Sequence, residues 1–234
     1  MQTIGDRVKA NYELRARHKL IRRMPIVVRV DGRAFHTFTR GMQRPFDQKL
    51  IDAMVAAAAA VGRDMQGFKA AYIQSDEASF FATDYDTLQT DGWFGYTKSK
   101  IETISASIMT ATFNRSIGIH KDAYFDARSF NIPREEVSNY FLWRAMDWER
   151  NSISMYCGAN FSHKQMHGKG KADQHELLHS IGLNWATDLT SQLKNGTWIF
   201  ADGSIRVDIP PSFDSINSVL RGLIDCDKLP SSVV

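Results

Sequence analysis

Apolar and polar residues follow two different periods along the chain, and the period predicts the type of each element. Alternating or continuous runs of β-branched and aromatic residues predict strands at residues 26–30, 69–73, 78–83, 123–132, 197–200 and 205–209. Apolar residues three or four positions apart predict helices at residues 4–19, 47–63, 98–115, 134–161 and 173–181. The last residues, 227–234, are predicted to fray.

From residue 26 to residue 132 the elements follow the order strand, helix, strand, strand, helix, strand. This is the order of the split βαβ unit, so we predict an α+β, ferredoxin-like fold with an antiparallel sheet and helices. We divide the chain into a core of residues 1–135, with a basic N-terminal helix, and residues 136–234, a helical extension with a small C-terminal hairpin. We expect the second part to pack on the first as one structural unit.

Two acidic turns are predicted to meet at one edge of this sheet. In a split βαβ unit the first two strands run parallel and the third lies antiparallel between them. The strand end at Asp31-Gly32 therefore lies beside the hairpin turn that holds Asp76 and Glu77. Converging carboxylates repel unless a cation separates them, and Mg²⁺ prefers oxygen ligands. Because Asp-Gly and Asp-Glu are also ordinary turn dipeptides, the pattern alone leaves a metal site and two simple turns equally open.

The composition is that of an ordinary globular protein and excludes few classes of function. Hydrophobic residues make up 43% and charged residues 24% of the chain, as in an ordinary globular protein. The net charge of +3 is mild, but basic residues cluster at 15–23 and 163–171, which indicates either solvated faces or a surface for a polyanion. The two cysteines lie far apart, without zinc or disulfide spacing, and we see no signal peptide or membrane span, so a cytoplasmic protein is expected.

Several longer motifs resemble one enzyme family. The stretch Val28-Arg-Val-Asp-Gly-Arg-Ala-Phe-His-Thr-Phe38, followed by Gln74-Ser-Asp-Glu77, resembles the tRNA-His guanylyltransferases, which are 3′-to-5′ polymerases. Phe125-Asp-Ala-Arg128, Trp143-Arg144 and the Asn151 segment match later motifs of that family in order, and the resemblance covers roughly residues 1–200. The family resembles ordinary polymerases and nucleotidyl cyclases in its palm, which agrees with the element order.

The resemblance implies a catalytic centre built on the acidic turns. Asp31, the Gly32 carbonyl and Asp76 would bind two Mg²⁺ ions, and Glu77 would support them as a third catalytic carboxylate. The triphosphate of ATP, GTP or another nucleotide would be held, largely through backbone amides, by Arg33, Ala34, Phe35, His36 and Ser75.

Outer contacts to phosphates or tRNA are also implied. They are expected from Arg29, Arg44, Asp47, Lys100, Arg150, Asn151, Lys169 and Lys171. Surface solubility is an equal alternative for Arg44 and Lys100, and a packed structural role is a rival for His36.

The resemblance implies that ATP activates a 5′ phosphate on tRNA and that the 3′-hydroxyl of a nucleoside triphosphate then displaces AMP. Where eukaryotic members carry His-Ile-Asn-Asn, this chain has Glu149-Arg-Asn-Ser152, and Gln174 or a neighbour replaces a lysine used in activation. Such a run is similar to the bacterial, archaeal and phage branch, which is associated with template-dependent repair of tRNA 5′ ends.

We therefore predict tRNA 5′-end repair. Addition of one guanosine to tRNA-His is the close alternative, and a palm-fold nucleotidyl cyclase, which has no need of the basic N-terminal stretch, is the distant one. A non-catalytic RNA-binding relative is disfavoured by the intact acidic residues. Because family members are typically tetrameric, a homo-tetramer is expected.

Overall fold

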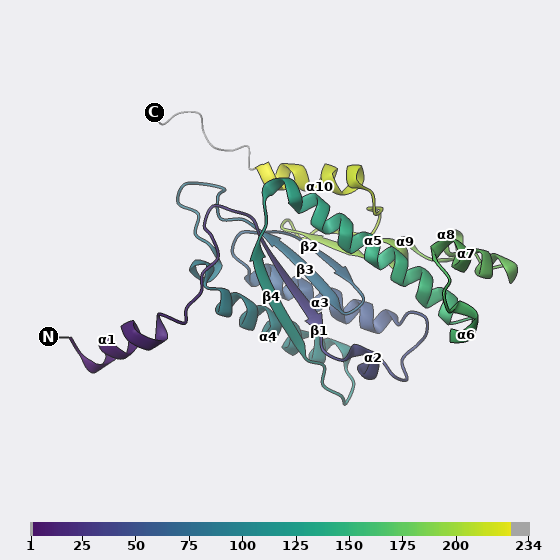
Figure 1. Cartoon of the computed structure of the whole chain (residues 1–234), viewed down its shortest axis with the longest axis horizontal. Coiled ribbons are helices and arrows are strands. Elements are labelled where there is room, and N and C mark those ends of the chain that lie inside the picture. Colours follow the sequence, from purple (N-terminus) through teal and green to yellow (C-terminus); the bar gives the residue numbers. More distant parts are fainter. Residues whose placement is uncertain (1, 226–234) are drawn as a thin grey trace.

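A computed structural model describes residues 2–225, and its centre is an antiparallel sheet between two layers of helices (Figure 1). The strand order is β4-β1-β3-β2-β5-β6. The strands are β1 (Ile26–Gly32), β2 (Phe68–Gln74), β3 (Glu77–Ala82), β4 (Phe125–Asn131), β5 (Thr197–Phe200) and β6 (Ile205–Arg206). Since β1 and β2 both run antiparallel to β3, which lies between them, the predicted split βαβ topology is confirmed.

Helices α3 (Gln48–Asp64) and α4 (Lys98–Ile117) cover one face of the sheet. The alanine run of α3 supplies small buried residues, among them Ala57 and Ala58, that let the helix approach the strands closely. Asp47 begins α3 as its N-cap, as predicted, because its carboxylate accepts the N–H groups of Lys49 and Leu50. This layer fixes the turn after β1 against the hydrophobic core.

Helix α5 (Arg134–Gly158) covers the other face, together with α10 (Phe213–Asp225). Val137, Phe141 and Ala145 of α5 contact the sheet through residues such as Tyr72 and Phe81. The C-terminal half of α5 carries a smaller apolar cluster with the short helices that follow it. Those helices are α6 (His163–Met166), α7 (Lys171–Ser180), α8 (Trp185–Asp188) and α9 (Ser191–Asn195).

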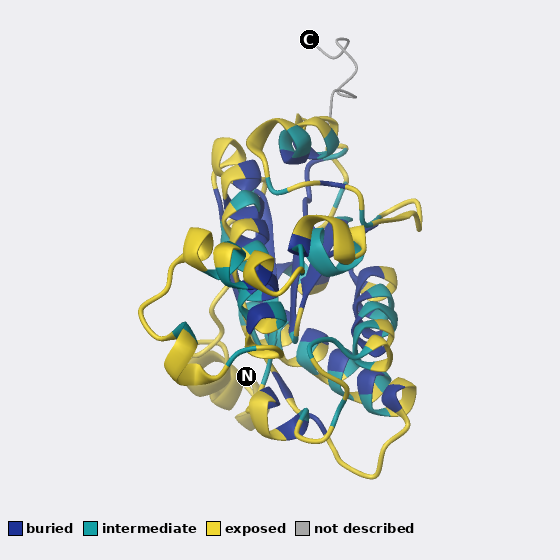
Figure 2. Ribbon diagram, turned by 90° about the vertical axis from the view of Figure 1, so that its right-hand side faces the viewer, coloured by how far each residue is buried: buried dark blue, intermediate teal, exposed yellow. Residues whose placement is uncertain are grey.

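The N-terminal segment differs from the single helix predicted over residues 4–19. It forms α1 (Ile4–Val8) and a π-helical turn, η1 (Lys9–Glu13), and all residues from 2 to 19 are exposed (Figure 2). The predicted apolar stripe therefore has no partner within the described residues. The basic cluster is also partly structural, because Arg22 forms ion pairs with Asp84 and Asp91.

The C-terminal region holds an element that the prediction missed. Ile216, Leu220 and Ile224 are buried at helical spacing in α10, whereas the chain after residue 209 was given no element. The strand predicted over 205–209 ends at Arg206, and α5 ends three residues early, before Ser162 caps α6. Residues 227–234, which were predicted to fray, lie outside the described part of the chain.

Two further short helices complete the description, α2 (Phe35–Phe38) and η2 (Trp93–Tyr96). None of the helices within residues 2–225 is long and apolar enough to cross a membrane.

Candidate functional site

The end of β1 and the β2–β3 turn lie side by side, as the topology predicted. The backbone N–H of Gly32 donates to the carbonyl oxygen of Asp76 at 3.0 Å. Asp31 stands directly opposite Glu77 in the β1–β3 register. Ser75 adopts a φ of 48°, and this left-handed residue lets two residues, Ser75 and Asp76, join the strands. Segments about 45 positions apart in sequence thus form one acidic edge.

Gly32 is required by its neighbour Phe35. A Cβ at position 32 would lie 2.3 Å from two carbons of the Phe35 ring. That ring is buried against Phe38, Phe113 and Phe125, with centroids 5.0 to 5.6 Å away. Phe35 therefore anchors the turn in the core, and the glycine permits the close approach of ring and backbone.

The turn after β1 presents backbone donors. Ala34 has a φ of 55°, which turns the chain into α2. The N–H groups of Gly32 and Arg33 donate hydrogen bonds to the carbonyl oxygens of Asp76 and Tyr124, respectively. Those of Ala34, Phe35 and His36 have no acceptor among the described residues. Consecutive free amides of this kind form a concavity that suits an anion such as phosphate.

Asp76 lies in an electrostatically unfavourable place for a carboxylate. Burial raises the pKa of Asp76 above its ordinary value, and the nearby charges of Asp31 and Glu77 act in the same direction. A hydrogen bond from the Ser75 hydroxyl, at 2.9 Å, opposes them. A bound cation would remove this penalty.

The donor set fits Mg²⁺ that is shared with a substrate. Asp31 and Asp76 supply carboxylate oxygens, and Gly32 supplies a backbone carbonyl at the same edge. Within the part of the chain that is described, no group of three or more His, Cys, Asp or Glu side chains is placed to hold an ion. Mg²⁺ usually takes one or two carboxylates and completes its shell with water and substrate phosphates, so two carboxylates suffice.

We expect Asp76→Asn to stabilise the metal-free protein. Because the pKa of Asp76 is raised from 3.8 on folding, the folded state holds its proton more tightly, and wild-type stability falls as the pH rises through that window. The stability gained by the variant should therefore be small near pH 4 and larger at pH 7. Urea unfolding in EDTA at both pH values measures it, and a variant less stable than wild type at pH 7 contradicts the prediction.

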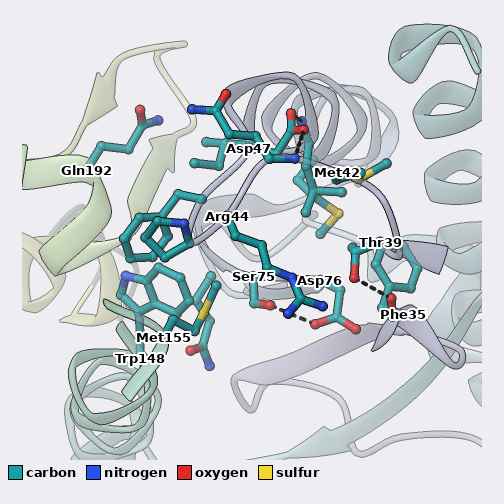
Figure 3. A pocket seen from close by; sticks show the side chains of 18 of the residues that line it. Phe35, Thr39, Met42, Arg44, Asp47, Ser75, Asp76, Trp148, Met155 and Gln192 are labelled. Carbon is teal, nitrogen blue, oxygen red and sulfur yellow. Dashed lines mark hydrogen bonds between the residues drawn. The ribbon is translucent and has the colours of Figure 1, made fainter. Parts of the chain in front are cut away.

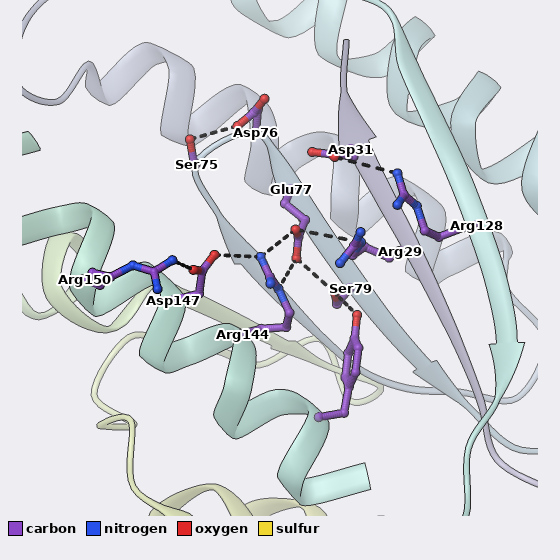
Figure 4. A network of polar contacts seen from close by, with 11 residues as sticks. Arg29, Asp31, Ser75, Asp76, Glu77, Ser79, Arg128, Arg144, Asp147 and Arg150 are labelled. Atoms are coloured by element: carbon purple, nitrogen blue, oxygen red, sulfur yellow. Dashed lines mark hydrogen bonds and ion pairs between the residues drawn. The ribbon is translucent and has the colours of Figure 1, made fainter. Parts of the chain in front are cut away.

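Glu77 faces α5 and is not free to bind a metal. Arg144 binds its carboxylate through two hydrogen bonds, of 2.7 and 2.8 Å, and Arg29 lies 3.9 Å away (Figure 4). Glu77 and Arg144 are both buried. In the structure Glu77 fixes the strand behind the turn to α5, and its role as a third catalytic carboxylate stays a prediction.

A cavity of about 550 Å³ opens beside Asp76, between the segment that leads into α3 and the C-terminal half of α5 (Figure 3). Its size is in the range of pockets for small ligands. Most of its wall is apolar, with Met42, Phe46 and Trp148 among the lining side chains, and its polar end is formed by Ser75 and Asp76. A flat apolar group with a phosphate tail would fit, its tail at the free amides.

Six of the predicted site residues line this cavity: Phe35, His36, Arg44, Asp47, Ser75 and Asp76. His36 lines it and is exposed, so the alternative of a packed structural histidine is wrong. Arg44 extends across the cavity toward Ser75 and Asp76 (Figure 3). Asp47 also lines it, but its carboxylate already accepts backbone N–H groups of residues 43, 49 and 50. The structure thus gives Asp47 a capping role, and its contact to a ligand stays a prediction.

Lys100 lies away from this cavity, and its contact to phosphate or tRNA stays a prediction. It lies in the first turn of α4, where the neighbouring Lys98 binds the carbonyl oxygen of Ser129. Ser129 pairs with Val28 in β1, and Lys100 lies over the ring of Phe94, 5.9 Å from its centroid. Helix α4 runs from there toward Asn114, which binds the chain just before Phe125, so Lys100 is at the end away from Asp31.

The remaining predicted contacts lie along α5 and after it. Arg150 forms an ion pair with Asp147, which also binds Arg144, and Asn151 is half-buried one turn from Trp148. Lys171 is paired with Glu149 at 2.6 Å. Lys169 is exposed in the link between α6 and α7. Gln174 binds the Ser154 hydroxyl and the Lys169 carbonyl, so its side chain is engaged in holding α7 to α5.

Sequence reasoning missed three residues of the site. Trp148 forms a wall of the cavity, and Lys121 holds α2 by donating to the carbonyls of Thr37 and Phe38. Arg128 reaches from β4 to within 4.0 Å of Asp31. Pairing in the sheet could have placed Arg128, because β4 was predicted, but nothing local indicates the long-range contacts of the other two.

Comparison with known proteins decides the family. Residues 5–133 match the tRNAHis guanylyltransferase family. The chain belongs to the tRNA(His) guanylyltransferase family. A bacterial guanylyltransferase-like protein solved with ATP is 40% identical, with a TM-score of 0.86 and coverage of 94% of this chain and 96% of that one.

Two more relatives agree with this assignment. Another structure of a bacterial guanylyltransferase-like protein, with GTP, is 36% identical at a TM-score of 0.83, covering 95% and 99% of the two chains. The tRNA(His) guanylyltransferase of Kluyveromyces lactis is 29% identical over 216 residues, or 82% of this chain and 89% of that protein. The chain is thus a member of a nucleotidyltransferase family with a polymerase-palm-like fold.

Proposed function

We propose that this family member adds nucleotides in the 3′-to-5′ direction to the 5′ end of tRNA and so repairs incomplete ends. The observation that carries the proposal is the position of Asp76 at the end of a nucleoside-sized cavity, with Asp31 at the same sheet edge and three free backbone amides beside them. Solved relatives at 36 and 40% identity contain GTP and ATP, which supports nucleotides as substrates.

The proposed reaction has two displacements at phosphorus. In the first, a 5′-phosphate oxygen of the RNA attacks the α-phosphorus of ATP, and pyrophosphate leaves. In the second, the 3′-hydroxyl of a nucleoside triphosphate attacks the activated 5′ phosphorus, loses its proton, and AMP leaves. The new 5′ end carries the triphosphate of the added nucleotide.

The same residues of the chain would bind and orient the substrates in both steps. Asp31, Asp76 and the Gly32 carbonyl would hold Mg²⁺, which supplies positive charge for the attacking and leaving oxygens. The amides of residues 34–36 orient the phosphates, and the cavity walls keep water from the nucleoside. Because both steps have the same geometry, one set of ligands serves both.

Repair is favoured over addition of one guanosine to tRNA(His) by the environment of residues 149–151. Glu149 is paired with Lys171 and Arg150 with Asp147, so these side chains are engaged within the protein. Contact of Glu149 or Arg150 with an anticodon would require these ion pairs to break. The higher identity to bacterial guanylyltransferase-like proteins than to the yeast enzyme points the same way.

The proposal is tested with 5′-monophosphorylated tRNAs, either complete or lacking their first nucleotide. With ATP, Mg²⁺ and all nucleoside triphosphates, the protein should restore the missing, base-paired nucleotide on several tRNA species. Addition confined to complete tRNA(His), opposite an unpaired position, would favour the single-guanosine activity. Cyclic nucleotide formed without RNA would favour a cyclase.

Arg44→Ala should weaken nucleotide binding at least about tenfold, because a charge-assisted contact to phosphate is worth roughly 1.5–3 kcal/mol. Titration with a fluorescent GTP analogue measures the loss. Arg40→Ala is the matched control, since Arg40 is exposed on the same segment and does not line the cavity. An equal loss in both variants would indicate general electrostatics instead of a specific contact.

The expected homo-tetramer and the repair of tRNA in the cytoplasm stay predictions of the family resemblance. A mass near four times 26.5 kDa in light scattering would support the tetramer.

A further inference from the structure

The turn that follows β1, residues 33–38, is held at both ends by one loop, which joins α4 to β4. At the start of the turn, the backbone N–H of Arg33 donates to the carbonyl oxygen of Tyr124 in this loop, at 2.8 Å. At the end of the turn, the ammonium group of Lys121, which also belongs to the loop, donates to two carbonyl oxygens. The amides that are proposed to orient the phosphates lie between these two contacts.

Lys121 binds the carbonyl end of the turn. Its ammonium group lies 2.6 Å from the carbonyl oxygen of Thr37, 2.9 Å from that of Phe38 and 5.2 Å from the centroid of the Phe38 ring. Carbonyls at the end of a helical turn lack intrahelical partners and carry partial negative charge, so a cation binds there favourably. The N–H groups of the same two residues donate to the carbonyl oxygen of Ala34, at 2.9 and 3.2 Å. Lys121 therefore restrains the turn as far as Ala34, where the amides begin.

The loop is in turn fixed to α4. Asn114 donates to the carbonyl oxygen of Ala123 at 3.0 Å and accepts the N–H of the same residue at 2.8 Å. Four residues earlier, and so on the same side of the helix, the hydroxyl of Thr110 accepts the N–H of Phe125 at 3.3 Å. Ala123 and Phe125 are both buried. These contacts give the loop a defined position relative to a helix of 20 residues.

The contacts of Lys121 are not needed to compensate a buried charge. Its side chain is exposed, and an exposed lysine loses side-chain freedom when it is held in one geometry. Two of its three N–H donors are occupied at the carbonyl end of the turn, whereas the phosphates are proposed to lie at the amide end. Fixing the turn accounts for these observations better than a direct contact to substrate.

We infer that Lys121 is a positioning residue for the triphosphate of the nucleotide substrate. It holds the turn from the loop that Asn114 anchors, and so keeps the amides of residues 34–36 directed at the phosphates. Binding phosphates to amides that are already in place costs less ordering than binding them to a mobile turn. The inference rests on the proposed function, and it adds a residue whose part in nucleotide binding no sequence motif indicates.

The test measures how strongly each variant prefers GTP to guanosine, by displacement of a fluorescent GTP analogue with Mg²⁺ present and without RNA. Lys121→Met removes the ammonium group and retains an apolar stem. It should weaken GTP binding about fivefold and leave guanosine binding unchanged, because only the phosphates would contact the amides of the turn. Lys121→Arg should retain most of the preference, because a guanidinium also donates to two carbonyls.

Two further variants define the effect. Asn114→Ala should lower the preference in the same direction, because the side chain of Asn114 holds the loop. Lys194→Met is the matched control. Lys194 also donates to a backbone carbonyl, that of Ala186, and lies 5.9 Å from the ring centroid of Trp185, but it does not line the cavity. Its preference should equal that of wild type.

Three results would overturn the inference. The first is an unchanged preference in Lys121→Met. The second is equal weakening of GTP and guanosine binding in that variant, because it would indicate a general loosening of the fold. The third is a preference that falls in Lys121→Met but is unchanged in Asn114→Ala, because it would assign Lys121 to direct contact with phosphate.

The outcome is separable from that of the proposed function. In the nucleotide-addition assay, Lys121→Met should raise the KM for the nucleoside triphosphate about fivefold and change kcat by less, as expected for lost substrate binding. If wild type restores the missing tRNA nucleotide while the preference for GTP does not depend on Lys121, only the positioning role fails. If wild type adds no nucleotide, the proposed function fails, whatever the preference.

Discussion

Asp31→Ala and Asp76→Ala are each expected to lower the rate of nucleotide addition about a thousandfold or more. The reason is that each removes one of the two carboxylates proposed to hold Mg²⁺ at the acidic edge, where Arg144 already binds Glu77. Metal-bound charge is worth several kcal/mol in the transition state, and about 1.4 kcal/mol corresponds to a tenfold change in rate. Single-turnover assays on activated RNA measure the effect.

Asp208→Asn is the control for this loss. Asp208 is an exposed carboxylate paired with Arg206, at the other edge of the sheet. Its rate should match that of wild type. Either active-site variant retaining a rate within a few-fold of wild type would remove the assignment of Asp31 and Asp76 as ligands.

Arg144→Ala is expected to destabilise the fold by roughly 3–5 kcal/mol, because it leaves the buried Glu77 carboxylate without its main partner. Arg144 is itself 7% exposed and also binds Asp147 at 3.0 Å. Urea unfolding measures the change. The turn that carries Asp76 should also loosen, so activity should fall in conditions where the variant is still folded.

A second variant separates charge from packing. Glu77→Gln combined with Arg144→Met removes both charges while retaining much of the side-chain volume, and it should cost less than the sum of the single changes. Arg150→Ala serves as the comparison, because its ion pair with Asp147 is exposed on the arginine side and should contribute little. Equal losses for Arg144→Ala and Arg150→Ala would contradict the buried network.

The pattern of the sequence was sufficient for the acidic edge. Strand, helix and hairpin periods fixed the split βαβ order, and that order requires the end of β1 to meet the β2–β3 turn. The position of Asp31 beside Asp76 follows from it, and the resemblance of the RVDGRAFHTF motif is what favours a metal site there over two ordinary turns. The type of each element and the order of the elements can both be predicted from hydrophobic periodicity, and the acidic edge depends only on these two features.

Side-chain roles set by distant contacts were beyond the same reasoning. Glu77 has the sequence of an acidic turn residue, but strand alternation turns it toward Arg144, 67 positions later in the chain. Lys100 was placed near the phosphates, although α4 carries it to the other end of the sheet. The ion pair of Glu77 and the position of Lys100 both depend on how the helices pack on the two faces of the sheet, which the sequence pattern does not give.

Two segments with helical spacing of apolar residues show that burial, and not spacing alone, determines whether a regular helix forms. The N-terminal segment has apolar residues at helical spacing, yet Ile4 and Tyr12 are more than 70% exposed and the helix is short and irregular. Helix α10 has a similar spacing and was overlooked, but it packs on α5 and the sheet. Tertiary contacts therefore stabilise α10, whereas the N-terminal segment has no such contacts.

The most direct test of the central claim uses RNA labelled with ³²P at its 5′ phosphate, together with ATP as the sole nucleotide. We predict that the wild-type protein and Mg²⁺ convert the label to a form that resists phosphatase, because AMP becomes joined to the 5′ phosphate, and that Asp31→Asn does not. Label that stays sensitive to phosphatase with wild type, or becomes resistant to the same extent with Asp31→Asn, would contradict the account.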